Sequence, residues 1–505
     1  MPTSNRSVSD AISLCAVSPA PQLRERLKAA ARDAREAVGL PVAAQGSLLR
    51  EPQRLGFNDG VIKPPSAFAP GVTARTVRSA AMERAPLRGQ VRVLVVLIDF
   101  EDKHFGQPAS RFSDLFFSAG EIPTGSVKEY YSEVTSGLVD IVGEVVGPYT
   151  MPHPLAWYAN GNYGIGNPSG EARANIMALD AIKAANPNVD LAPYDNDRNG
   201  YVDAFVVVHA GRGGEETGDP GDIWSHKWVL PKELNADGTK VYAYLTIPED
   251  AKLGVSAHEL GHLLFGFPDL YDTDYTSEGI GNWCLMAGGS WNGGGDRPAH
   301  PSAWCKAQQG WVSVENVTTP GVKALPDVKT AGTVTRLWTG GQSGREYFLL
   351  ENRQRAGYDA DLPGAGLLIW HVDESQDSNT DENHYLVALV QADGMRQLEH
   401  DANRGDDGDP FPGSSQNSSF SPDSSPSSQS YGGQDTGIVV AEISGSADPM
   451  AAKLSVSGDV TPPDGGDEPD QLASTVADLK ARVAALEIAA NSAGTALSTV
   501  SPQGA

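Results

Sequence analysis

The chain has little cysteine, little positive charge and no long apolar run. Its three cysteines, Cys15, Cys284 and Cys305, are an odd number, which excludes a fully paired disulfide framework. Cys284 and Cys305 could pair with each other or could be buried thiols. A formal net charge of −26, from 38 basic and 64 acidic residues, argues against nucleic-acid binding and against polybasic membrane contacts. No apolar stretch is long enough for a transmembrane helix, and residues 1–18 lack the basic start and apolar centre of a signal peptide.

Histidine is also scarce, with ten residues in the 505-residue chain, yet two of them stand four residues apart. The segment His258-Glu259-Leu260-Gly261-His262 has the H-E-x-x-H pattern of zinc peptidases. Residues four apart lie one above the other on one face of a helix, so His258 and His262 can bind the same metal ion. Glu259 then lies beside the metal-bound water and can accept its proton. The mostly apolar surroundings predict a buried active-site helix that ends near Gly266 and Pro268.

A third metal ligand is expected shortly after this helix. Asp269 follows a glycine that can turn the chain back under the metal, and Asp272 or a residue outside this stretch is the alternative. About twenty residues later, a tight apolar turn presents Met286. A methionine in such a turn packs as core whether or not a metal lies above it.

Three motifs together resemble the secreted immune inhibitor A family of metallopeptidases, which are relatives of the metzincins. They are H-E-x-x-H, P-D-L-Y-D at residues 268–272, and W-x-L-M-x-G-G-S-W at residues 283–291. The resemblance covers roughly residues 89–458. It implies that His258, His262 and Asp269 bind zinc, that Glu259 is the general base, and that Met286 packs beneath the ligands. Phe265 stands where the family has glycine, so Gly266 and Asp269 fall one residue late, which a longer helix or a bulge could absorb.

A second motif predicts a calcium site. Residues 195–203 alternate oxygen-bearing side chains around Gly200, as calcium loops do. The twelfth position is Val206, not the glutamate of an EF-hand, so the loop is only EF-like. An acidic turn joining two elements is the alternative. The expected calcium ligands are Asp195, Asp197, Asn199, Tyr201 (by its carbonyl) and Asp203.

The predicted fold is α+β. A metzincin-like peptidase domain with a mixed sheet and active-site helix occupies residues 89–315, including buried strands at 91–100 and 204–209 and a helix at 126–136 capped by Ser126. Residues 1–88 look like a prosegment, with a polar helix near 22–38 and then a Pro/Gly-containing tract with few core candidates. Residues 316–458 predict a β-rich domain, with strands near 333–338, 346–351, 366–372 and 385–391. Within it, residues 405–413 could be a cation loop or an acidic surface turn, and residues 414–430 read as a flexible insertion.

Two further segments complete the chain. Residues 459–470 form an acidic Pro/Gly linker. Residues 471–500 carry a short heptad seam, which predicts either weak self-association or a helix that docks on its own chain. Three isolated histidines or acids, His226, His371 and Asp373, are expected to be structural rather than part of the site.

The favoured function is a zinc endopeptidase, supported by calcium, that acts on extracellular proteins. The extracellular location and synthesis as a precursor are implications of the family resemblance. A prosegment thiolate can occupy an open zinc position, so Cys15 is a candidate for latency. The alternative is a catalytically silent relative that serves as a calcium-dependent adhesion or scaffold module. The intact Glu259 favours the enzyme, because a silent relative has little reason to keep the proton shuttle.

Overall fold

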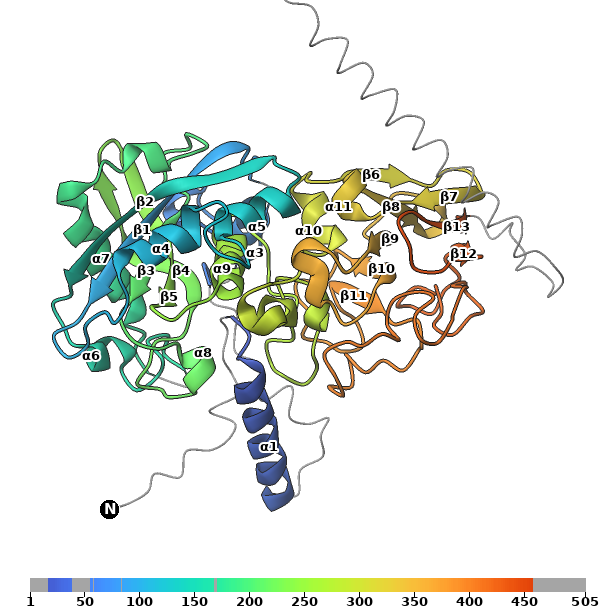
Figure 1. The fold of residues 1–505 in the computed structure, drawn as a ribbon, viewed down its shortest axis with the longest axis horizontal. Helices are drawn as coiled ribbons and strands as arrows, with labels where there is room; N and C mark the ends of the chain where they lie inside the picture. Colours follow the sequence, from blue (N-terminus) through green and yellow to red (C-terminus); the bar gives the residue numbers. More distant parts are fainter. Residues whose placement is uncertain (1–16, 39–54, 58, 83, 168–169, 457–505) are drawn as a thin grey trace, which may run out of the picture.

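The structure is a computed structural model that describes residues 17–38, 55–57, 59–82, 84–167 and 170–456. Within these ranges the chain forms an α+β fold of two adjoining blocks, as Figure 1 shows. The predicted linker at 459–470 and the heptad helix at 471–500 lie outside the described residues, as does Cys15. Among the residues described, no helix is long and apolar enough to cross a membrane.

The first block is built on a five-stranded mixed sheet, in the order β2-β1-β3-β5-β4. Four strands run parallel, and β4 is antiparallel to β5. The predicted strands at 91–100 and 204–209 are confirmed, as β1 and β3. The strands are β1 (Gly89–Asp99), β2 (Val139–Thr150), β3 (Phe205–His209), β4 (His226–Ala236) and β5 (Thr239–Pro248).

Both faces of this sheet are buried, because side chains on β1 alternate between two cores. Val93 and Val95 belong to the core that contains α4, α5 and α9, whereas Leu94 and Val96 face α7. The helix predicted at 126–136 is confirmed as α5, and Ser126 caps it in a capping box with Glu129. The helices of this block are α4 (Ala109–Phe117), α5 (Val127–Val134), α6 (Leu155–Ala159), α7 (Ala174–Ala185), α8 (Gly214–Thr217) and α9 (Leu253–Phe265).

The second block is β-rich, and strands lie in all four segments where the sequence predicts them. Five strands form one sheet in the order β11-β10-β9-β8-β6, and three form another in the order β12-β13-β7. The strands are β6 (Ser313–Asn316), β7 (Gly321–Leu325), β8 (Thr333–Trp338), β9 (Glu346–Arg353), β10 (Gly366–Asp373), β11 (Val387–Val390), β12 (Val439–Ala441) and β13 (Met450–Ser455). The helices are α10 (Ala303–Gln308) and α11 (Val328–Ala331).

Residues 414–430 are not the flexible insertion that their serine content suggests. Phe420 is fully buried and packs in the core between the two sheets. Its N–H donates to the Val440 carbonyl, and the buried Ser428 hydroxyl donates to Ile438. One aromatic anchor and a set of side-chain hydrogen bonds fix this segment, which composition alone does not reveal.

The N-terminal segment has more core residues than its composition predicts. The helix predicted near 22–38 is confirmed as α1 (Pro21–Val38), and α3 (Ala74–Met82) follows it. Val17 and Leu23 are buried in the same core as the first sheet, and so are Phe57 and Ile62 from the tract after the helix. The expectation of few core residues in that tract is therefore wrong. Short 3-10 turns occur at Pro65–Ala67, Asn186–Asn188, Ala192–Tyr194, Gly281–Trp283, Gly288–Gly295, Thr339–Gly341 and Gly357–Asp361.

Candidate metal centre

The helix α9 carries the H-E-x-x-H segment, and its end explains the late glycine. Phe265 is still helical, and Gly266 takes a left-handed conformation with φ 68°. The Gly266 N–H donates to the His262 carbonyl, as in the αL cap that commonly ends helices, and the Phe267 N–H donates to the Gly261 carbonyl. The additional residue therefore lengthens the helix, and no bulge is needed.

Three potential ligand atoms converge at one point beside this helix. The Nε2 atoms of His258 and His262 lie 3.0 Å apart. Asp269 Oδ1 lies 3.1 Å from the first and 3.2 Å from the second. Zinc–ligand bonds of about 2.0–2.1 Å in tetrahedral geometry require ligand atoms separated by roughly 3.3 Å. Both the donor set and its spacing therefore fit a zinc ion.

Backbone carbonyls fix the orientation of both imidazole rings. His258 Nδ1 lies 2.9 Å from the Leu285 carbonyl, and His262 Nδ1 lies 2.5 Å from the Phe267 carbonyl. A carbonyl oxygen can only accept a hydrogen bond, so each Nδ1 carries the proton and donates the bond. The other ring nitrogen, Nε2, then faces the cluster. All three side chains are buried, Asp269 at 7% exposed and both histidines at 0%. These residues are therefore held ready to bind a metal.

The charges in this cluster depend on one another. Burial lowers the pKa of His258, but the Asp269 carboxylate more than offsets burial and leaves that pKa raised. At His262 burial prevails, and the pKa is lowered. Burial would raise the pKa of Asp269, yet the two histidines bring it below its ordinary value. A divalent cation displaces the proton shared in such a cluster, because metal ligands bind in their deprotonated form.

Glu259 lies on the same helix and has an unusual environment. Its side chain is fully buried, and among the described residues neither carboxylate oxygen accepts a hydrogen bond of good geometry. Burial raises the pKa of Glu259 to about 8, although the nearby His258 and the Val17 N–H act in the opposite direction. A nearby divalent cation reverses this effect of burial on a carboxylate.

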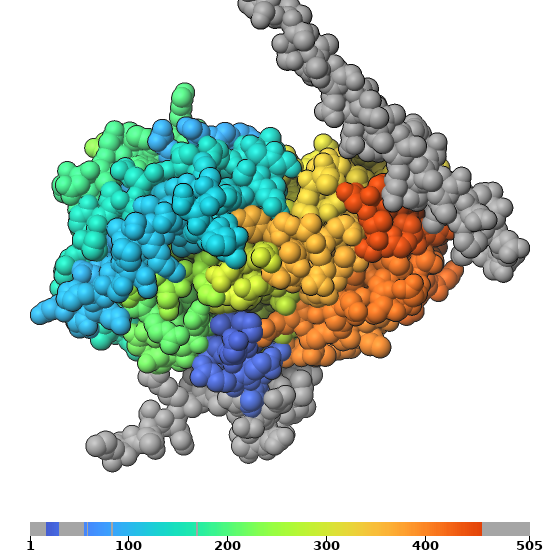
Figure 2. All heavy atoms as spheres, in the orientation of Figure 1, coloured from blue at the N-terminus to red at the C-terminus, as the bar shows by residue number. Residues whose placement is uncertain are grey.

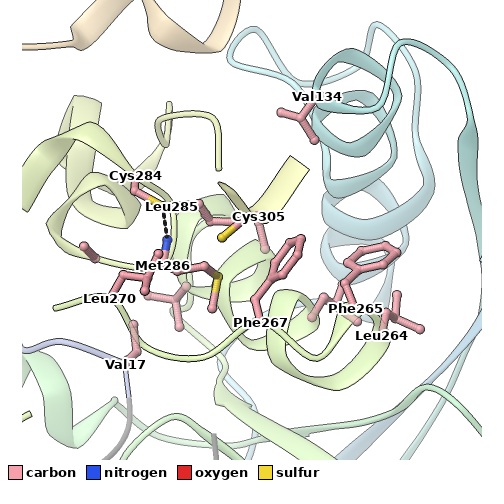
Figure 3. Close-up of a cluster of buried hydrophobic side chains, with 14 of the residues drawn as sticks. Val17, Val134, Leu264, Phe265, Phe267, Leu270, Cys284, Leu285, Met286 and Cys305 are labelled. Atoms are coloured by element: carbon pink, nitrogen blue, oxygen red, sulfur yellow. Dashed lines mark hydrogen bonds between the residues drawn. The ribbon is translucent and has the colours of Figure 1, made fainter. Parts of the chain in front are cut away.

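Met286 lies in the turn predicted to support the cluster. It is fully buried, and Figure 3 shows it beside Leu270 and Leu285. The Met286 carbonyl accepts the Leu270 N–H at 2.7 Å, which joins the turn to the residue after Asp269. A Cβ on Gly261 would come within 2.8 Å of the Met286 sulfur. Gly261, which the motif leaves unspecified, thus lets the turn approach the helix.

The acidic loop brings its three predicted carboxylates together. Single carboxylate oxygens of Asp195, Asp197 and Asp203 lie within 4.8 Å of one another. The Asn199 amide donates to Asp197 at 2.6 Å, and the Tyr201 side chain reaches away to Glu233. Arg84 lies 3.0 Å from Asp203 Oδ1. Burial, only partly offset by Arg84, raises the pKa of Asp203 to about 6.

Sequence reasoning missed a further acidic cluster, in which Asp272 takes part. Asp272, Asp274 and Glu382 each offer an oxygen within 4.8 Å of the others. Asp272 thus lies in this acidic cluster, whereas Asp269 lies beside the two histidines, and which residue completes the metal site stays a prediction. Glu382 comes from a distant part of the chain, so no local motif could have revealed the cluster.

In residues 405–413, Asp409 accepts the Trp283 indole N–H at 2.9 Å, as a structural turn residue does.

The three isolated residues that were predicted to be structural make contacts of that kind. His226 is fully buried between the Trp224 carbonyl and the Tyr244 hydroxyl. His371 lies 2.9 Å from Glu346 and stacks on Tyr431. Asp373 accepts from His384. None of them belongs to the histidine cluster.

An N-terminal segment lies against the strand region next to the candidate centre, with the Val17 N–H close to Glu259. The Val17 N–H donates to the Ser225 carbonyl at 3.3 Å, and the Trp224 indole N–H donates to the Val17 carbonyl at 2.9 Å. The Trp291 indole N–H donates to the Ser18 carbonyl at 2.8 Å. Figure 2 shows the helix that follows seated between the two blocks of the molecule. The segment thus binds through its main chain, as a peptide in a cleft does.

Comparison with known proteins agrees with this geometry. Residues 84–315 match the family model described as immune inhibitor A peptidase M6, catalytic domain. Immune inhibitor A of Bacillus thuringiensis subsp. alesti is 33% identical over 286 residues, which are 45% of this chain and 41% of that protein. The pre-pro-metalloprotease PrtV of Vibrio cholerae serotype O1 (strain M66-2) is 30% identical over 298 residues, 47% of this chain and 32% of that protein. The predicted resemblance to the immune inhibitor A family is thereby confirmed for residues 84–315, which contain the histidine cluster, and the chain spans less than half of either relative.

Proposed function

We propose that this protein is a zinc-dependent endopeptidase whose catalytic domain comprises residues 89–315, with a metzincin-like active site. The observation that carries the proposal is the convergence of His258, His262 and Asp269 to within 3.2 Å beside Glu259. The match of residues 84–315 to a peptidase catalytic domain supports it. The substrates are peptide bonds of extracellular proteins, and the protein is secreted, like the family that its motifs resemble.

Each residue of the centre has a distinct task. His258, His262 and Asp269 hold the metal, and zinc, when bound, supplies a Lewis acid that makes its water acidic near neutral pH. The Glu259 carboxylate would accept a proton from the attacking water and hold it for the leaving amine. The carbonyls of Leu285 and Phe267 keep both imidazole rings in the tautomer that presents Nε2. Met286 packs under the cluster and binds nothing.

Residues 1–88 act as a prosegment in this proposal. Val17 and Ser18 fill hydrogen-bonding positions at Ser225, Trp224 and Trp291 beside Glu259, so a substrate cannot use them at the same time. Gly60 packs against the end of α9, where an added Cβ would lie 2.2 Å from the Gly266 Cα. Cys15 stands two residues before Val17 but lies outside the described residues. Its role in latency stays a hypothesis.

Calcium is proposed at the loop of residues 195–203. Asp195, Asp197 and Asp203 supply three carboxylates, and Asn199 lies against Asp197. The Arg84 guanidinium neutralises Asp203 in the intact chain. Calcium affinity should therefore rise once residues before 89 are removed, because one competing positive charge leaves with them.

The alternative function, a silent adhesion or scaffold module, has less support. It gives no reason for the buried carboxylate of Glu259, which accepts no hydrogen bond of good geometry from the described residues. Burying such a group destabilises a fold, and a catalytic role explains why the chain keeps it. The β-rich residues 316–458 and the predicted heptad helix at 471–500 remain the parts through which partners or further copies of the chain would bind.

The test compares casein cleavage by the full chain, by a chain that begins at residue 89, and by Glu259→Ala in both. We expect the shortened wild type to cleave, a zinc chelator to stop it, and the variant to be inactive. If the shortened chain does not fold, limited trypsin treatment of the full chain provides the same comparison.

Metal content gives an independent readout. Zinc should be bound at one ion per chain in wild type and in Glu259→Ala, and lost in His262→Ala. The matched control is His104→Ala, whose imidazole is 69% exposed and distant from the cluster. Bound zinc without cleavage in the wild type would refute the peptidase and favour the scaffold.

A further inference from the structure

The two described cysteines lie together beneath the turn that carries Met286. Cys284 and Cys305 are both fully buried, and both contact Ser302, Cys284 through its sulfur and Cys305 through its backbone N–H. Figure 3 shows the pair beside Leu285 and Met286. Twenty-one positions separate them in sequence (305 minus 284), so tertiary structure makes them neighbours.

Ser302 keeps the two sulfurs close. Its N–H donates to the Cys284 sulfur at 3.2 Å, and its hydroxyl caps α10 by accepting the Cys305 N–H at 3.4 Å. Because Ser302 contacts the sulfur of one cysteine and the backbone of the other, the turn and the start of α10 form one unit.

The two sulfurs differ in character. Burial raises the pKa of Cys284, but the Cys305 thiol, the N–H groups of Met286 and Ser302, and the charge of Arg353 outweigh burial and lower it. Burial and the neighbouring Cys284 raise the pKa of Cys305. The lower pKa makes Cys284 the better nucleophile of the two, because the thiolate is the attacking form of cysteine.

We propose that Cys284 and Cys305 are a dithiol that peroxide converts into a disulfide, with Cys284 as the attacking sulfur and Cys305 as the resolving one. The bond would cross-link the methionine turn to α10. Because the Leu285 carbonyl on this turn orients His258, oxidation would fix the support of the metal centre to the start of the second block. The cross-link does not depend on whether the protein is a peptidase.

The chemistry balances with hydrogen peroxide as the oxidant. The Cys284 thiolate attacks one peroxide oxygen, the O–O bond breaks, and Cys284 becomes a sulfenic acid while hydroxide leaves. The Cys305 thiol then attacks the sulfenic sulfur. The S–S bond forms, the S–O bond breaks, and the oxygen leaves as water. Two thiols lose two electrons in total, and one peroxide becomes two waters.

The experiment uses the full chain, reduced and then treated with hydrogen peroxide. Thiols are counted after denaturation, and the peptides are mapped by mass spectrometry without reduction. We expect the count to fall from the three cysteines of the sequence to one, with a single cross-linked pair of peptides containing Cys284 and Cys305. The mapping separates this product from any oxidation of Met286.

Two variants test the roles of the sulfurs. In Cys305→Ser, a dimedone adduct should appear at Cys284, because the sulfenic acid has no resolving thiol. In Cys284→Ser, no such adduct should form at Cys305. Cys15→Ser is the control and should still form the cross-link. A wild-type count that stays at three, or a cross-link that includes Cys15, would overturn the pairing, and an adduct only at Cys305 would overturn the assigned roles.

Discussion

Replacing Arg24 by methionine tests whether the N-terminal helix holds the prosegment over the metal centre. The Arg24 side chain is 5% exposed and enters a pocket formed by Glu278 and Asp401, acidic residues from two distant parts of the chain. Its guanidinium donates to Glu278 at 3.0 Å, to the Ser277 carbonyl at 2.6 Å and to Asp401 at 3.3 Å. Methionine keeps the apolar stem and removes all three hydrogen bonds.

The magnitude follows from what remains after the substitution. A hydrogen bond to a charged group contributes about 1.5–3 kcal/mol, and breaking a buried ion pair costs about 3–5 kcal/mol. Lys28 lies 2.7 Å from both Glu278 and Asp401 and still compensates their charges. We therefore expect a loss of about 2–3 kcal/mol in docking free energy. At about 1.4 kcal/mol per tenfold change, the undocked population rises roughly 30- to 150-fold.

The assay measures cleavage of a quenched peptide by the full chain without prior proteolysis. Under the proposed latency, the residual rate of the wild type reports the small undocked population, so Arg24→Met should raise it by the same factor. Digestion by trypsin within residues 1–88 should accelerate in parallel, which gives a readout independent of activity. The control is Arg26→Met on the same helix, whose guanidinium makes an exposed hydrogen bond to the Thr217 carbonyl.

The reasoning fails if Arg24→Met is folded, binds zinc and has the same residual rate and trypsin sensitivity as the wild type. That result would show that docking of the prosegment does not depend on this ion pair. An equal increase in the residual rate of Arg26→Met would show that the effect arises from any such substitution on α1 and not from the loss of the Arg24 ion pair.

Three further predictions concern other parts of the molecule. Burial raises the pKa of Glu215 from 4.5 to about 7, so the native state holds a proton that the unfolded chain releases, and stability falls as the pH rises from about 4.5 through 7. Glu215→Gln should remove this fall and be more stable at pH 8 by up to about 3 kcal/mol, which urea unfolding at pH 4.5 and 8 measures; equal slopes in both proteins would contradict it. Calcium at one hundred times its Kd should add about 2.7 kcal/mol to the unfolding free energy of the wild type and so raise its Tm, but not that of Asp197→Asn; an equal rise in both would exclude the loop as the site. Phe420→Ala should cost about 3–5 kcal/mol, whereas the exposed Asp423→Ala should cost nothing measurable in the same unfolding assay; a neutral Phe420→Ala would restore the flexible-insertion interpretation.

Local patterns determined a large part of this protein. The four-residue spacing of His258 and His262 places both on one helix face wherever that helix packs. The continuous apolar run of β1 predicts a strand buried on both faces, and Ser126 followed by Glu129 predicts a helix start. These signals act within a few residues, so they can be read without knowing the fold.

Only the tertiary structure decided which distant residues meet. The choice between Asp269 and Asp272 depends on how the chain leaves α9, which ends at Gly266 and brings Asp269 beside both histidines. The meeting of Glu382 with Asp272, and the docking of Val17 against Trp224, join segments far apart in sequence. Composition misjudged residues 414–430 and the N-terminal segment for the same reason: burial of single anchors such as Phe420 and Val17 depends on partners that the local sequence does not contain.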